Sequence, residues 1–130
     1  MNLRFYHCSI CGKVITILSD NEIPTICCNQ DMEEIVPNRA DGAAEKHVPV
    51  FTRTGNTVLV KIGSNPHPMT DSHRITWIGL RSTYGFQFKE LHPNGEPAAI
   101  FSLLPEDHVE AVYAYCNLHG LWYSDQEADV

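Results

Sequence analysis

Four of the five cysteines are spaced as ligands of one metal ion. Cys8 and Cys11 are separated by two residues, and Cys27 and Cys28 are adjacent. Four thiolates form a soft, tetrahedral donor set that suits zinc or a single iron ion. Common zinc ribbons use two Cys-x-x-Cys pairs, whereas adjacent side chains of an extended chain point to opposite sides. We therefore expect a distorted backbone at the Cys27–Cys28 pair.

A second group of metal-binding residue types lies further along the chain. Cys116 and His119 are three residues apart, close enough to hold one ion from a single loop. His67 is flanked by two prolines, which stiffen the chain around it, and His73 follows six residues later. His47 precedes a β-prone segment. Imidazole and thiolate together suit ferrous iron.

Composition limits the classes of function. The 130 residues suit one domain or one domain with a small appendage, and the formal net charge of -7 argues against nucleic-acid binding. The sequence has no apolar run long enough to span a bilayer and no secretory signal pattern, so we expect a cytoplasmic protein and no membrane partner. In that reducing compartment an odd number of cysteines favours metal ligands over disulfides.

The hydrophobic pattern predicts short strands throughout. Residues 1–36 form a module too small for a large core, with a strand at 14–18, and 37–46 have the composition of a linker. Further strands are expected at 48–51, 58–62, 75–80, 86–89 and 98–103, with turn residues between them. This spacing predicts a β-sandwich. Residues 105–115 fit a helix or a strand equally well.

Several motifs together resemble the desulfoferrodoxin family, the two-iron superoxide reductases. Cys8-x-x-Cys11-Gly12 followed by Cys27-Cys28-x-Gln30-x-Met32 is similar to its N-terminal module. The segments EKHVP, HPM with a later histidine, and CNLHG are similar to its second metal site. The resemblance runs from about Cys8 to Trp122.

The resemblance implies a fold and a chemistry. The fold is all-β: a desulforedoxin-like module over 1–36 and an immunoglobulin-like β-sandwich over 37–130, with residues 105–115 as strand and loop. The activity is one-electron reduction of superoxide to hydrogen peroxide. Two iron ions per chain are implied, although the first site could carry zinc in a recombinant sample. A rubredoxin-like electron donor and a homodimer are implied as partners.

The resemblance also assigns residues. The first iron is held by Cys8, Cys11, Cys27 and Cys28; the second is held by His47, His67, His73 and His119 in a plane, with Cys116 axial and the opposite position open in the ferrous form. Lys46 is the candidate for attracting superoxide, and Glu45 for occupying the open position once the iron is ferric. Residues matching no ligand position are His7, His92 and His108, and we assign Trp77 and Trp122 to core packing.

Three other functions fit parts of this pattern. An electron-transfer protein would pass electrons through both irons without turning over a substrate. A structural or interaction protein would hold zinc in the four-cysteine module. A superoxide dismutase would also oxidise superoxide to oxygen. The complete set of four histidines and one cysteine favours the reductase.

Overall fold

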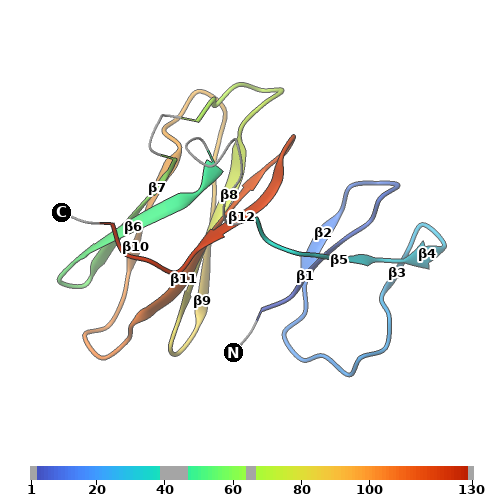
Figure 1. Ribbon diagram of the computed structural model, residues 1–130, viewed down its shortest axis with the longest axis horizontal. Helices are drawn as coiled ribbons and strands as arrows, with labels where there is room; N and C mark the ends of the chain where they lie inside the picture. The colour runs from blue at the N-terminus through green and yellow to red at the C-terminus, as the bar shows by residue number, and fades with distance from the viewer. Residues whose placement is uncertain (1–2, 39–46, 64–66, 129–130) are drawn as a thin grey trace. The chain divides into compact units, whose positions relative to one another are not determined.

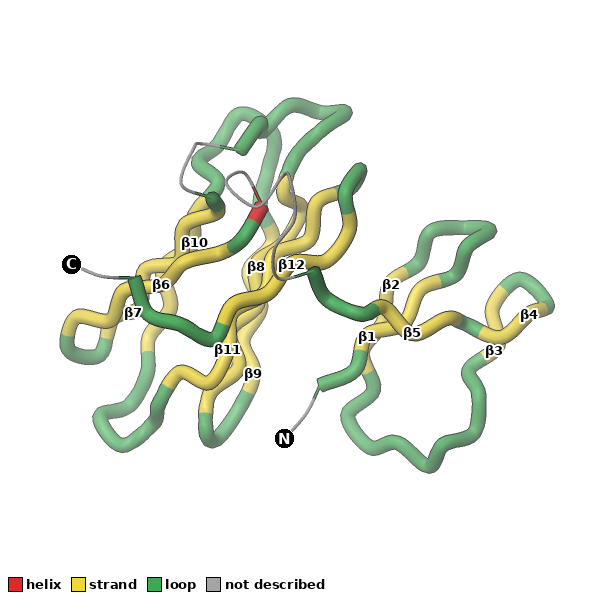
Figure 2. The backbone as a smooth tube through the Cα atoms, viewed as in Figure 1, coloured by secondary structure: helices red, strands yellow, loops and turns green. Residues whose placement is uncertain are grey.

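The computed structural model describes residues 3–38, 47–63 and 67–128, and the chain divides into two compact units (Figure 1). The first unit comprises Met1–Val36 and the second Pro37–Val130. All named elements of the described residues are strands, and the single helical residue His47 forms no element of its own, so the predicted all-β fold is confirmed (Figure 2). No helix in these ranges is long and apolar enough to cross a membrane.

The first unit is a small assembly of five short strands. They are β1 (Phe5–His7), β2 (Val14–Thr16), β3 (Ile26–Cys27), β4 (Gln30–Asp31) and β5 (Glu33–Ile35). An antiparallel sheet has the order β2-β1-β5, and β3 pairs with β4 in a separate hairpin. The strand predicted at 14–18 ends at Thr16, and Leu18 is 86% exposed. Few apolar side chains are therefore buried here.

The second unit is a sandwich of two antiparallel sheets. One sheet, in the order β10-β7-β6, contains β6 (Pro49–Thr54), β7 (Thr57–Ile62) and β10 (Ala98–Ser102). The other, in the order β12-β11-β8-β9, contains β8 (Ile75–Ser82), β9 (Phe86–Glu90), β11 (Val109–Cys116) and β12 (Gly120–Ser124). Each predicted strand of this unit is present, with ends shifted by up to three residues.

The core of the sandwich follows from the alternation of side chains along the strands. In β7 the buried residues Val58, Val60 and Ile62 alternate with more exposed neighbours, as the sequence predicts. The core cluster consists of Phe51, Val58, Val60, Ile62, Met69, Ile75, Ile78, Leu80, Ala99, Phe101, Leu103, Val112, Ala114 and Cys116. Cys116 is thus a core residue at the end of its strand.

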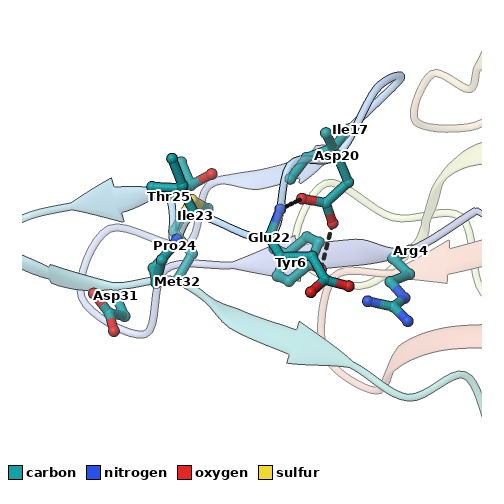
Figure 3. Close-up of a pocket in the computed structure, with 10 residues that line it drawn as sticks. All are labelled: Arg4, Tyr6, Ile17, Asp20, Glu22, Ile23, Pro24, Thr25, Asp31 and Met32. Atoms are coloured by element: carbon teal, nitrogen blue, oxygen red, sulfur yellow. Dashed lines mark hydrogen bonds between the residues drawn. The ribbon is translucent and has the colours of Figure 1, made fainter.

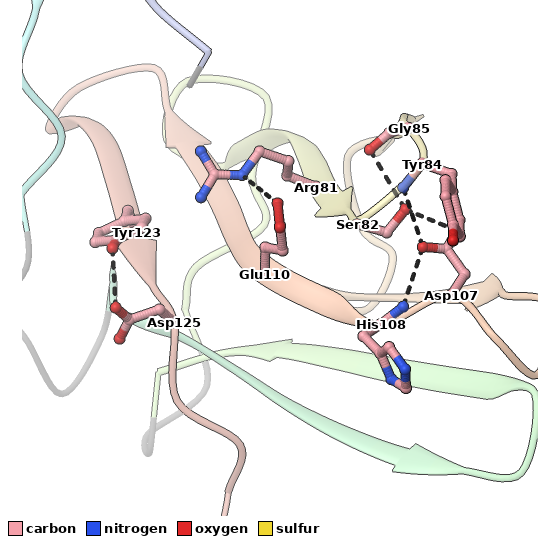
Figure 4. Close-up of polar contacts among 9 residues, drawn as sticks. All are labelled: Arg81, Ser82, Tyr84, Gly85, Asp107, His108, Glu110, Tyr123 and Asp125. Atoms are coloured by element: carbon pink, nitrogen blue, oxygen red, sulfur yellow. Dashed lines mark hydrogen bonds and ion pairs between the residues drawn. The ribbon is translucent and has the colours of Figure 1, made fainter. Parts of the chain in front are cut away.

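The ambiguous stretch at 105–115 is a loop followed by strand β11. This strand lies between β8 and β12, and both of its faces are covered, since Ala111, Val112 and Tyr113 are all buried. The preceding loop is held by the buried carboxylate of Asp107, which accepts hydrogen bonds from Ser82 Oγ (2.9 Å) and from two backbone amides (Figure 4). Pairing on both edges therefore overrides the helical spacing of the sequence.

The assignment of Trp77 to the core is wrong. Its ring is half-buried, stacks on Tyr115 at an interplanar angle of 1° and meets Phe88 edge to face. None of these three residues belongs to the core cluster. Trp77 precedes the core residue Ile78, and successive side chains of a strand point to opposite faces. Its place in the strand register therefore puts it on the outer face of the sheet.

Candidate metal centres

Sheet register brings the second group of predicted ligands to one end of the sandwich. His47 precedes β6 and His67 follows β7, and these two strands pair Pro49 with Ile62 at that end. His73 precedes β8, whose first residue, Ile75, pairs with Cys116, the last residue of β11. His119 lies in the turn between β11 and β12. Residues from four segments of the chain, the last of which carries both Cys116 and His119, therefore meet at one end of the sandwich.

The four imidazole rings form a closed cycle of contacts. The order is His47, His67, His73, His119 and back to His47, with successive ring centroids 4.7, 4.9, 5.1 and 4.7 Å apart. Each ring meets the next edge to face, at interplanar angles of 71° to 79°. One ligand atom from each ring and the sulfur of Cys116 all lie within 4.8 Å of one another. This is a four-nitrogen, one-sulfur donor set around one point.

The donor atoms are spaced as ligands of a transition metal. His47 Nε2 and His119 Nδ1 are 3.0 Å apart, and Cys116 Sγ is 3.7 Å from His119 Nδ1. Two nitrogen ligands at right angles, each about 2.1 Å from a metal, would be about 3 Å apart. His119 thus presents Nδ1 to the cluster, whereas His47 presents Nε2.

His67 is prepared for metal binding by its neighbour. Nδ1–H donates to the carbonyl oxygen of Pro68 over 2.7 Å, which leaves Nε2 as the acceptor nitrogen. Nε2 is buried and has no hydrogen bond to any described residue. Burial lowers the pKa of His67 from 6.5 to about 4, with smaller contributions from His47 and other ring charges, against the opposing effect of the Pro68 bond. A buried nitrogen lone pair without a donor fits a metal ligand.

Asn117 and Thr70 orient the His73 segment. Asn117 Oδ1 accepts a hydrogen bond from the amide of Arg74 (2.9 Å), and Nδ2 donates to the carbonyl of Ser72 (2.8 Å). Thr70 Oγ1 accepts from the amide of His73 over 3.0 Å. The two Asn117 bonds join the His73 loop to the Cys116–His119 turn, and the Thr70 bond lies within the loop. Sequence reasoning missed both residues, because a short polar side chain in a loop has no distinctive spacing.

Trp122 belongs to the site rather than only to the core. It is buried, as predicted, but its indole stacks on His47 with ring centroids 4.7 Å apart. Its Nε1–H donates to the carbonyl oxygen of His119 over 3.2 Å. A tryptophan three residues after a candidate ligand is the signal that could have identified it. Glu45 and Lys46 lie outside the described residues, and His7, His92 and His108 are absent from both clusters.

The four predicted cysteines converge within the first unit. Cys11 Sγ is 3.6 Å from Cys27 Sγ, which is 4.0 Å from Cys28 Sγ, and all four sulfurs lie within 4.8 Å of one another. Sulfur atoms at the corners of a tetrahedron about 2.3 Å from a metal would be about 3.8 Å apart. None of the cysteines forms a disulfide. The sulfur positions therefore fit a tetrahedral metal ion.

The expected backbone distortion at the adjacent cysteines is confirmed. Cys28 and Asn29 have φ angles of 52° and 63°, and they connect the paired residues Cys27 and Gln30. A two-residue hairpin loop with positive φ at both positions is a type I′ turn, whose twist matches that of the flanking strands. The turn carries the Cys28 sulfur to the same side as the Cys27 sulfur. Adjacent cysteines, whose side chains would point to opposite sides of an extended chain, can therefore face the same metal ion.

Hydrogen bonding gives the thiols of Cys8, Cys27 and Cys28 different pKa values. Backbone amides of Cys11 and Ile10 lower the pKa of Cys8 from 9.0 to about 6. Side-chain hydrogen bonds, first to Cys8 and then to Cys11, raise the pKa of Cys28 to about 12, and the Cys11 side chain raises that of Cys27. Cys8 is therefore the most readily formed thiolate of these three. Thiolates are the form that binds metal, so metal loading would release the remaining protons.

A surface cavity of about 430 Å³ also lies in the first unit (Figure 3). Charged side chains of Arg4, Asp20 and Glu22 line it, and Tyr6 Oη donates to Asp20 Oδ2 over 3.5 Å. Its lining contains neither histidine nor cysteine. The residues that line this cavity are therefore different from those of both candidate metal centres.

Comparison with known proteins identifies the family. Residues 39–125 match the family model described as desulfoferrodoxin, and 2–35 match the desulfoferrodoxin N-terminal domain. A desulfoferrodoxin homolog from Methanothermobacter thermautotrophicus is 40% identical over 121 residues, covering 92% of this chain and 96% of that protein.

Solved structures of superoxide reductases also match this chain. The superoxide reductase of Treponema pallidum matches with a TM-score of 0.81 and 32% identity, over 95% of this chain and 98% of that one. The superoxide reductase (1Fe-SOR) of Giardia intestinalis matches with a TM-score of 0.55 and 33% identity, over 65% of this chain and 99% of that one. Two matched family models together span nearly all of the sequence. The chain belongs to the desulfoferrodoxin family.

Proposed function

We propose that this protein is a superoxide reductase, which converts superoxide, one electron and two protons into one molecule of hydrogen peroxide. The observation that carries the proposal is the closed ring of His47, His67, His73 and His119 with the sulfur of Cys116 beside it. Similarity to superoxide reductases of known structure supports it. The physiological role would be removal of reactive oxygen species.

These five residues are the proposed ligands of the catalytic iron. A ferrous ion held there would supply the electron, and the Cys116 thiolate would raise its electron density. Cys116 is fully buried whereas His119 is exposed, so the cluster reaches solvent on the side of His119. We assign the approach of superoxide to that side. Protons would come from solvent.

Two residues outside the described ranges complete the proposed site. Lys46 would attract superoxide, since the whole chain has a formal net charge of -7 and attraction needs a local positive charge. Glu45 would occupy the open position once the iron is ferric. Lys46 adjoins the proposed ligand His47 in sequence and Glu45 precedes Lys46, and the EKHVP segment that contains all three resembles the family motif.

The remaining proposals concern the first unit and the partners. We assign residues 1–36 a second iron held by Cys8, Cys11, Cys27 and Cys28, and residues 37–130 the catalytic domain. A rubredoxin-like carrier would return the electron. Five free cysteines favour a cytoplasmic location, because that compartment keeps thiols reduced. A homodimer is proposed from the family resemblance, and light scattering of the purified protein tests it.

Product stoichiometry tests the proposed activity. The fully reduced protein, with iron in both sites verified by metal analysis, receives a calibrated pulse of superoxide, and peroxide and oxygen are both quantified. One peroxide per superoxide without oxygen is the expected result. Half a peroxide with oxygen released would indicate dismutation. If superoxide disappears no faster than in buffer, the result would reject the reductase and favour an electron-transfer protein.

A further inference from the structure

Trp122 contacts two of the four clustered histidines with one side chain. Its indole lies nearly parallel to the His47 imidazole, at 16° and a centroid distance of 4.7 Å, and its Nε1–H is bonded to the His119 carbonyl. The side chain is 2% exposed. A buried indole N–H needs a hydrogen-bond partner, and here the partner is the backbone of a candidate ligand.

The strand around Trp122 also pairs with Asn38, nine residues before His47. The amide of Asn38 donates to the carbonyl of Leu121 over 2.9 Å, and the amide of Tyr123 donates to the carbonyl of Asn38 over 3.0 Å. Asn38 therefore pairs with Trp122 as a parallel bridge. Asn38 and His47 therefore each contact the part of β12 around Trp122.

We propose that Trp122 is a positioning residue for the His4Cys metal centre. The torsion that rotates an imidazole about its bond to Cβ has a broad minimum, so the ring needs an external contact to hold one orientation. The stacked indole supplies that contact for His47, and the N–H bond holds the turn that carries His119. Because ligand orientation controls metal affinity and electronic structure, both depend on Trp122. The inference rests on the proposed metal site.

Two variants separate the stacking contact from the hydrogen bond. Trp122→Phe keeps one aromatic ring against His47 and removes the N–H donor together with one of the two fused rings. Trp122→Leu removes both contacts. Phe101→Leu is the matched control, because Phe101 is a comparably buried aromatic residue of the core that lies on β10, a strand that carries no proposed ligand.

The experiment measures anaerobic ferrous iron binding to the His4Cys site of the full chain by competition with a chelator. Absorption of the four-cysteine site serves as the internal reference. Trp122→Leu should weaken iron binding about tenfold, the lower end of the range for residues that orient ligands, and Trp122→Phe should weaken it less. The thiolate-to-iron absorption band of the oxidised His4Cys site should shift in Trp122→Leu. Phe101→Leu should change neither quantity.

The alternative outcomes contradict the proposal. Equal weakening in Trp122→Leu and Phe101→Leu would mean that Trp122 acts only through stability of the fold. Wild-type affinity and an unshifted band in Trp122→Leu would overturn it as well. Should that variant not fold, Trp122→Phe decides alone, and wild-type affinity with an unshifted band would reject the role. Iron binding is measured without superoxide, so failure of the proposed activity would be seen separately, in product stoichiometry.

Discussion

His67 donates its Nδ1–H to the carbonyl oxygen of Pro68, the next residue in the chain, over 2.7 Å. The bond determines the tautomer, so the nitrogen that faces the cluster is the one with a free lone pair. Because Nε2 is buried, protonation there is unfavourable. His67 therefore remains in the metal-binding form at pH values where an exposed histidine is already charged.

This relationship predicts how pH changes the stability of the metal-free protein. The folded-state pKa of His67, about 4, lies below its ordinary value of 6.5. Between these values the unfolded chain binds a proton that the folded chain does not, so the free energy of unfolding falls as pH decreases from about 6.5 to 4. Urea unfolding of wild type and His67→Gln across this range measures the effect. Parallel pH profiles for the two proteins would contradict it.

Asn117 should control iron retention at the His4Cys cluster. Asn117→Ala removes the two side-chain hydrogen bonds that join the Ser72–Arg74 backbone to the Cys116 turn. We expect iron affinity to fall about tenfold, because the backbone on both sides of His73 loses these hydrogen bonds. Chelator competition measures this, with the exposed loop variant Asn56→Ala as the control. Equal affinities for both variants would show that Asn117 does not orient the ligand.

Metal removal should unfold the first unit and leave the second folded. Of the described residues in Met1–Val36, only Phe5, Cys8 and Met32 are buried, whereas the sandwich has a core cluster of fourteen residues. A unit with so little buried apolar surface depends on its metal. Hydrogen exchange before and after chelation measures this through the amides of β1 and β7. Retained protection in β1 after metal loss would refute it, and added zinc should restore lost protection.

The turn at the adjacent cysteines predicts that position 29 accepts glycine but not a β-branched residue. Asn29 has a φ of 63°, which glycine adopts without strain and which a β-branched residue avoids. Asn29→Gly should retain metal, while Asn29→Val should destabilise the first unit by about 1–2 kcal/mol. The rate of metal loss to a chelator reports both effects. Asn56→Val, at a loop position outside the positive-φ region, serves as the control. Slower metal loss from Asn29→Val than from Asn29→Gly would contradict the assignment.

Lys46 is predicted to accelerate the reaction with superoxide through its charge. Lys46→Ala should lower the second-order rate constant about tenfold at low ionic strength, and the difference should shrink as salt screens the charge. Pulse radiolysis at several salt concentrations measures the rate constant. Lys46→Arg should restore most of it, and Lys61→Ala, on the exposed side of β7, should have little effect. An unchanged rate constant in Lys46→Ala would remove Lys46 from the mechanism.

The sequence alone identified both groups of candidate ligands and most strands. Cys8, Cys11, Cys27 and Cys28 could be grouped because ligands of one ion recur at short, fixed spacing within single turns. The alternation of Val58, Val60 and Ile62 identified β7 because a strand repeats every two residues. Both signals are local, so they can be read without knowing which strands are neighbours.

Tertiary structure decided everything that depends on strand pairing. Residues 105–115 fit two local patterns, and pairing with β8 and β12 selected the strand. The same pairing put Trp77 on the outer face of its sheet, although it was expected in the core, and brought the buried Trp122 against His47. The cycle of four histidines forms because register brings residues from opposite sheets to one end of the sandwich. Such proximity between distant segments has no local signature in the sequence.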